Sequence, residues 1–155
     1  MTLLAILAVA LGLHADPRDT LAIEHAAARH HADLPLVSAV CCAESSVGVH
    51  GTILCGAHLR LPLAACMADP AFAARVRAAR RARRRLPLCL NRDRDAQADF
   101  PARLFGGVAR RHWPRMLANY RCGPNPACQR TVGAAYAARV LALRARFVAT
   151  QRRGR

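Results

Sequence analysis

"HHADLPLVSAVCCAESS", residues 30–46, is the stretch that decides the fold. Four of its residues follow the i, i+3, i+4, i+7 spacing of one helix face: Val37, Val40, Cys41 and Glu44. The spacing predicts a helix that begins near Asp33 and places Glu44 on the apolar stripe, close to the C-terminal end. Burial and the negative end of the helix dipole both favour a protonated carboxyl there, as a general acid requires. The alternative is a frayed helix end, where Glu44 simply reaches water.

The rest of the chain is also helical in pattern. Asp16-Pro17, followed by Asp19 or Thr20 as a cap, predicts a first helix. Asp69 as a cap and Pro70 at the first position predict another, and residues 91–100 are interpreted as a polar connector. A last helix carries an apolar face made of Tyr136, Val140, Leu143 and Phe147. Only residues 49–54 suggest a strand, so we expect a mainly α fold with little or no β-sheet.

The composition indicates a single basic domain. The chain has 155 residues and a formal net charge of +15. We expect one domain over residues 16–150 and a basic tail over 151–155. The charge favours anionic partners such as nucleic acid, acidic lipid or an acidic cell-wall polymer. Seven arginines between Arg75 and Arg85 form either a polyanion patch or a solvated helix face. We favour the solvated face, because the arginines surround the helix.

The cysteines and the N-terminus indicate export. The seven cysteines form no C-x-x-C pair, so disulfides explain them better than zinc, and the odd number leaves one thiol unpaired. The apolar run Thr2–Leu13 is too short to span a bilayer and resembles a signal-peptide core, with residues 1–15 removed. A buried first helix is the alternative. We expect a periplasmic or extracellular protein.

Three stretches in order carry a resemblance to a known family. They are the capped helix that ends in Glu-Ser-Ser, the loop "GVHGTILCG" (residues 48–56), and "MLANYRCGPNP" (116–126) followed by "VGAAYAARVLAL" (132–143). This order resembles the soluble lytic transglycosylases of the lysozyme-like superfamily, over about Thr20 to Leu143. The resemblance implies a lysozyme-like helical domain.

The resemblance also implies roles for particular residues. Glu44 matches the family's catalytic acid, Tyr120 matches the tyrosine whose hydroxyl lies beside that acid, and Tyr136 matches the tyrosine of the last motif near the sugar cleft. The sequence differs from the family pattern directly after Tyr120, where it has Arg121 and the family has Asn.

The loop between these motifs would bind sugar. Gly48 and Gly51 match the two glycines of the family's cleft wall, and Ser46 or Thr52 could replace the serine that helps to hold the sugar. Leu54 stands where the family's loop ends in Gln. The interval from Glu44 to the loop glycines is also shorter than in the family, so these departures concern sugar affinity.

The cysteine spacing suggests disulfide pairs. Cys122 and Cys128 bracket a Pro/Gly turn, and Cys55 could reach Cys41 or Cys42. Cys66 and Cys89 would link the two ends of the arginine helix, the predicted helix that begins at Pro70 and carries the arginines from Arg75 onward. Neighbouring helix residues point about 100° apart, so Cys41 and Cys42 cannot both face Cys55.

The resemblance implies that a monomeric enzyme cleaves peptidoglycan non-hydrolytically with a single Glu, and needs no metal or cofactor. No stable membrane span is expected. Three alternatives remain: a lysozyme-like wall-binding module without activity, a hydrolytic lysozyme that recruits Asp93, Asp95 or Asp99, and a nucleic-acid binder built on the arginine helix. The last ranks lowest, because Trp113 is the only tryptophan available for base stacking.

Overall fold

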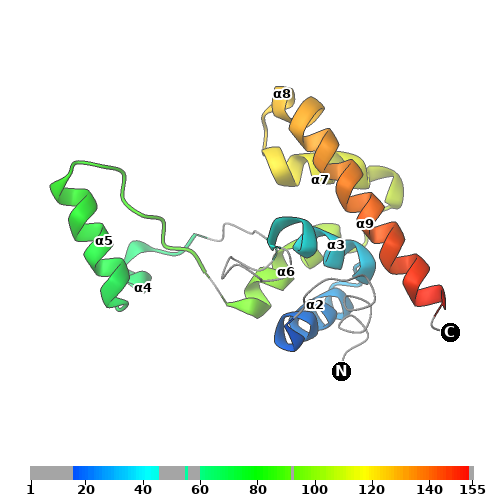
Figure 1. Ribbon diagram of the computed structural model, residues 1–155, viewed down its shortest axis with the longest axis horizontal. Coiled ribbons are helices and arrows are strands. Elements are labelled where there is room, and N and C mark those ends of the chain that lie inside the picture. The colour runs from blue at the N-terminus through cyan, green and yellow to red at the C-terminus, as the bar shows by residue number, and fades with distance from the viewer. Residues whose placement is uncertain (1–15, 46–54, 56–59, 92, 154–155) are drawn as a thin grey trace. The chain divides into compact units, whose positions relative to one another are not determined.

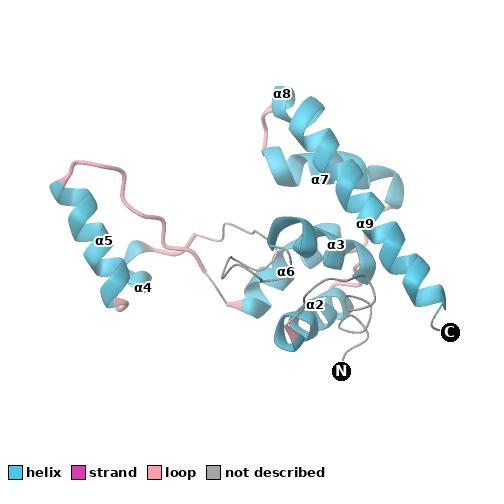
Figure 2. Cartoon of the chain, viewed as in Figure 1, coloured by secondary structure: helices cyan, strands magenta, loops and turns pink. Residues whose placement is uncertain are grey.

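The protein is mainly α-helical. The computed structural model describes residues 16–45, 55, 60–91 and 93–153, and within these residues it contains helices, loops and one isolated bridge between Arg60 and Leu90, with no strand (Figure 2). The elements in chain order are α2 (Pro17–Arg29), α3 (Leu34–Ser45), α4 (Leu63–Cys66), α5 (Pro70–Arg81), α6 (Arg94–Phe105), η1 (Arg110–His112), α7 (Trp113–Cys122), α8 (Pro126–Cys128), η2 (Gln129–Gly133) and α9 (Ala134–Arg153). The prediction of a mainly α fold stapled by disulfides is therefore confirmed.

The chain forms two compact units. The smaller one lies within His58–Asp93, contains α4 and α5, and is called the insert below; the other helices form the main unit. Both units fall within the range expected to be one domain. At the C-terminus, α9 continues through Arg153, into the residues expected to form a tail.

A disulfide and a small apolar cluster hold the insert together. Asp69 caps α5 by accepting a 2.9 Å hydrogen bond from the Ala71 backbone N–H, with Pro70 at the first position, as predicted. Phe72 and Val76 bury one side of α5 and cluster with Cys89, which is bonded to Cys66. The arginines of α5 are exposed: Arg75, Arg77, Arg80 and Arg81.

Close packing between helices builds the main unit. Helix α2 packs against α6 and α3, while α9 packs against both α3 and α7 (Figure 1). The largest fully buried apolar side chains come from every one of these helices: Ile23, Leu36, Val37, Val40, Phe105, Leu117, Val140 and Phe147. Alanines fill much of the remaining core, which allows the helix axes to approach closely.

Polar side chains cap the N-terminal ends of α2 and α3. Asp16 caps α2, because its carboxylate accepts a 2.8 Å hydrogen bond from the Arg18 backbone N–H. The prediction of Asp19 or Thr20 as the cap was wrong, since the helix already begins at Pro17. Asp33 accepts a 2.9 Å hydrogen bond from the Leu36 backbone N–H at the start of α3, as the sequence indicated.

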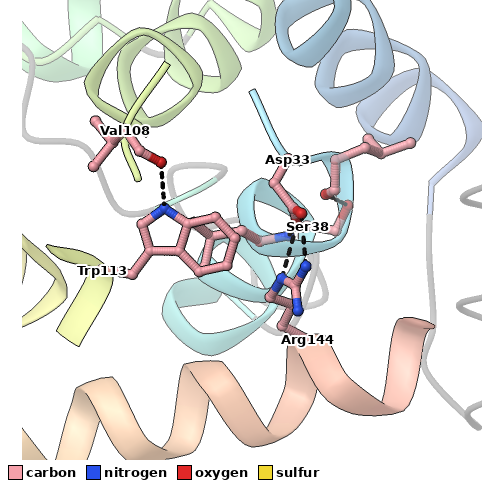
Figure 3. Close-up of polar contacts among 7 residues, drawn as sticks. Asp33, Ser38, Val108, Trp113 and Arg144 are labelled. Carbon is pink, nitrogen blue, oxygen red and sulfur yellow. Dashed lines mark hydrogen bonds and ion pairs between the residues drawn. The ribbon is translucent and has the colours of Figure 1, made fainter. Parts of the chain in front are cut away.

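A bidentate ion pair fixes the start of α3 against α9. Arg144 donates to the two Asp33 carboxylate oxygens, at 2.9 Å from Nε and 2.7 Å from Nη2 (Figure 3). The same guanidinium lies 4.7 Å from the centroid of the Trp113 ring, whose Nε1 donates to the Val108 carbonyl at 3.1 Å. Both charged side chains are more than three-quarters buried, so the pair is shielded from solvent. It locks the helix that carries Glu44 at its other end.

Two further sequence interpretations have an outcome here. The prediction of a polar connector over residues 91–100 is wrong, because from Arg94 onward the chain forms α6. This helix buries Gln97, Ala98 and Pro101 within the main unit. The suggested strand at residues 49–54 lies outside the described residues. No helix in the described parts of the chain is both long and apolar enough to cross a bilayer.

Candidate active site

The candidate site is built on the C-terminal end of α3. Val37, Val40 and Cys41 are fully buried, and the Glu44 side chain on the same stripe is only 12% exposed. The predicted placement of Glu44 is therefore confirmed. Its Oε1 atom is buried and accepts no well-formed hydrogen bond from any described residue. A buried carboxylate oxygen that makes no hydrogen bond of good geometry with the described residues is costly to stability, which makes Glu44 a candidate for a chemical role.

Two tyrosines from different helices lie beside this carboxylate. Tyr120 of α7 and Tyr136 of α9 stack with ring centroids 6.5 Å apart and an interplanar angle of 12°. Burial raises the pKa of each phenol well above its usual range, and the negative charge of Glu44 raises it further. Both hydroxyls therefore stay protonated at neutral pH and remain hydrogen-bond donors. The structure thus brings together the three residues that the sequence placed in one site.

The hydroxyls of the two tyrosines are used differently. Tyr120 donates a 2.7 Å hydrogen bond to the backbone carbonyl of Cys55, and Cys55 is joined by a disulfide to Cys41 in α3. This chain of contacts ties α7 to the helix that carries Glu44. The buried hydroxyl of Tyr136 makes no well-formed hydrogen bond with the described residues. The Tyr136 hydroxyl interacts with the Glu44 carboxylate, and the loose geometry leaves both polar groups able to bind a ligand.

Two arginines frame the site, and sequence reasoning had not assigned them a role. Arg121 Nη1 lies 3.4 Å from Glu44 Oε2, and Arg139 Nη2 donates a 2.8 Å hydrogen bond to the Ala43 carbonyl. Both guanidinium groups lie near the Tyr136 ring, at 5.9 Å and 5.8 Å from its centroid. Two features of the sequence could have indicated these arginines: the replacement of the family's Asn by Arg121, and the position of Arg139 three residues after Tyr136.

Several other carboxylates of the main unit are engaged elsewhere. Asp33 pairs with Arg144, as described above. Asp99 lies 2.7 Å from His30 Nε2 and 3.3 Å from Arg29, so its carboxylate is held between α2 and α6. Glu44 is the carboxylate whose charge acts on both tyrosines. Among the described residues, Glu44 is thus the acid around which the two tyrosines are arranged.

A hollow adjoins Tyr120. It measures about 280 Å³ and lies between α6 and α7. Its lining is mainly apolar, with one side-chain amide: Phe100, Leu104, Met116, Asn119 and Tyr120. An apolar surface with a single amide suits the face and the acetamido group of an amino sugar.

The cysteines pair as their spacing suggested, with Cys41 rather than Cys42 bonded to Cys55. Cys42 is left as the free thiol. Burial raises its pKa to about 12, so it is protonated and unreactive at neutral pH. The four predicted sugar-binding residues of the loop lie outside the described residues: Ser46, Gly48, Gly51 and Thr52.

Paired Tyr→Phe substitutions test how the two hydroxyls are used. We expect Tyr136→Phe to change the free energy of unfolding less than Tyr120→Phe does, because the Tyr136 hydroxyl interacts with Glu44 but makes no hydrogen bond of good geometry with a described residue. Tyr120→Phe should lower it by about 1 kcal/mol, because the Cys55 carbonyl loses its donor. Urea unfolding followed by circular dichroism measures both. A larger loss for Tyr136→Phe would contradict the assignment.

Comparison with known proteins adds no information about this site. No protein-family model, no curated protein and no solved structure matches the chain.

Proposed function

We propose that this protein is a peptidoglycan lytic transglycosylase, which cleaves the glycosidic bond between N-acetylmuramic acid and N-acetylglucosamine without water. One observation carries the proposal. The Glu44 carboxylate is largely buried, has an oxygen that makes no hydrogen bond of good geometry with a described residue, and interacts with two stacked tyrosines. The resemblance of the sequence motifs to the soluble lytic transglycosylases supplies the substrate class.

A single carboxylate suffices for this reaction. Protonated Glu44 gives its proton to the glycosidic oxygen as the bond from that oxygen to the muramic anomeric carbon breaks. The resulting carboxylate then takes the proton of the substrate's own 6-hydroxyl, whose oxygen bonds to the anomeric carbon. The product ends in a 1,6-anhydro ring, and Glu44 is again protonated. The intramolecular nucleophile relies on proximity, so no second carboxylate has to position a water molecule.

The two tyrosines support the acid in different ways. Tyr120 positions the site, since its hydroxyl is committed to the Cys55 carbonyl. Tyr136 keeps a protonated hydroxyl free of well-formed hydrogen bonds with the described residues, so it can donate to a substrate oxygen near Glu44. The hollow beside Tyr120 then receives a sugar ring.

The charge and the disulfides fit an exported enzyme. The net charge of +15 favours an anionic polymer such as the cell wall as the setting for the reaction. Disulfides form and persist in oxidising compartments. The three disulfides of this protein therefore support the proposal of a periplasmic or extracellular location.

Mass analysis of digested peptidoglycan tests the reaction. Purified sacculi are incubated with the protein, and the released muropeptides are identified by mass. We expect 1,6-anhydro-muropeptides, which are lighter than hydrolytic products by the mass of water. Reducing-end products instead would make the protein a hydrolytic lysozyme. Binding to sacculi without release of any product would make it a non-catalytic wall-binding module.

A further inference from the structure

The Arg121 guanidinium lies beside the Glu44 carboxylate, the group that transfers the proton in the proposed reaction. Its Nη1 atom is 3.4 Å from Glu44 Oε2, a longer separation than the roughly 2.7–2.9 Å of a strong charge-assisted hydrogen bond. The side chain is 49% exposed, whereas that of Glu44 is 12% exposed. A half-exposed guanidinium in a loose ion pair can exchange its partner at little cost.

The surroundings of Arg121 carry more positive charge than negative. The Arg139 guanidinium lies near the same Tyr136 ring, and its hydrogen bond goes to a neutral group, the Ala43 carbonyl. Among the described residues, Glu44 is the acidic ion-pair partner of Arg121, and Arg139 forms no ion pair. Two cations and one anion leave room for a second anion at the edge of the site.

We propose that Arg121, with Arg139 beside it, binds a carboxylate of the substrate and thereby makes the site selective for acidic glycan. This inference rests on the proposed function. The planar guanidinium presents paired N–H donors that match the two oxygens of a carboxylate. When Arg121 turns to the substrate carboxylate, Glu44 Oε2 is released from the ion pair and becomes accessible to the substrate.

The substrate offers such a carboxylate in two places. Where no peptide is attached, N-acetylmuramic acid carries a free carboxylate on its lactyl ether. Where a peptide stem is attached, the lactyl carboxyl is a neutral amide, and the stem supplies carboxylates of its own. A glycan of N-acetylglucosamine alone has none. Selectivity for a carboxylate therefore separates peptidoglycan from neutral chitin-like chains, which share the same sugar backbone.

Binding measurements test the inference independently of turnover. Isothermal titration uses Glu44→Gln protein, so that no ligand is consumed, with and without Arg121→Asn. The probes are chitotetraose, the muramyl tetrasaccharide without stems, the same tetrasaccharide with its lactyl carboxylates amidated, and the stem-bearing tetrasaccharide. We expect amidation to weaken binding about tenfold when Arg121 is present and to have no effect after Arg121→Asn. If amidation has no effect but removal of the stems does, in an Arg121-dependent way, the stem supplies the carboxylate.

Matched variants exclude a general effect of charge. Arg115→Asn removes one positive charge from the same helix and should leave the carboxylate preference intact. Arg121→Lys should restore part of the preference, because it keeps the charge but loses the fork.

The outcomes for the site and for the reaction are distinguishable. The inference is overturned if amidation and stem removal weaken binding equally with and without Arg121, even if anhydro products form. Conversely, Arg121-dependent carboxylate binding without anhydro products would support the anion site and overturn the transglycosylase reaction.

Discussion

Glu44→Gln should reduce the release of anhydro-muropeptides to about a thousandth of the wild-type rate or less. The amide has nearly the same shape as the carboxyl, but it can neither give a proton to the glycosidic oxygen nor take one from the 6-hydroxyl. Both steps of the proposed reaction depend on the same side chain, so the substitution removes the acid and the base together. Rates are measured by quantifying products from sacculi at equal protein concentration.

The other glutamate of the chain is the matched control. Glu24→Gln makes the same chemical change in α2 and should leave the rate within about twofold, since Glu24 is not part of the site. Thermal unfolding of both variants shows whether each one is folded. If Glu44→Gln retains most of the rate, Glu44 is not the acid and the proposed mechanism is wrong.

Loss of the Cys41–Cys55 disulfide should lower both the stability of the main unit and the activity. Its partners are 14 residues apart, and closure of a loop of that length contributes about 3 kcal/mol by restricting the unfolded chain. We expect Cys41→Ala/Cys55→Ala to lower the free energy of unfolding of the main unit by about that amount. Activity should fall as well, because the Cys55 carbonyl that holds Tyr120 is no longer tied to α3.

The disulfide of the insert provides the comparison. Cys66→Ala/Cys89→Ala opens a bridge between residues 23 apart, in the unit that does not contain the site. We expect it to destabilise the insert and to leave product release unchanged. Denaturant unfolding and the sacculus assay on both double variants give the two comparisons. Equal loss of activity from both would show that the Cys41–Cys55 bridge has no special link to the site.

Local chemistry made much of this fold predictable. Apolar residues at helical spacing placed Glu44 on the buried side of α3, and Asp69-Pro70 marked the start of α5, because these signals depend only on near neighbours. The disulfide pairs followed from short separations along the chain. The sequence could not decide between Cys41 and Cys42, because that choice depends on which way α3 faces the rest of the main unit.

The misses came from contacts that are distant along the chain. Residues 91–100 looked like a connector because charged and polar side chains predominate, yet packing against α2 buries one side of them in α6. The pairing of Arg121 with Glu44 joins residues 77 apart, and no periodicity in the sequence signals it. The order of the motifs predicted that Glu44, Tyr120 and Tyr136 share a site. The positions of the two arginines beside them became visible only in the packed structure.

The two ends of the insert meet. Arg60 and Leu90 form an antiparallel bridge, and the Leu61 backbone N–H donates a 2.9 Å hydrogen bond to the Cys89 carbonyl. A segment that leaves and returns at neighbouring points can be gained, lost or replaced during evolution without rerouting the surrounding chain. The seven arginines from Arg75 to Arg85 lie within it, so their charge can be tuned without altering the residues around Glu44. The charge of the insert and the residues around Glu44 can therefore change independently.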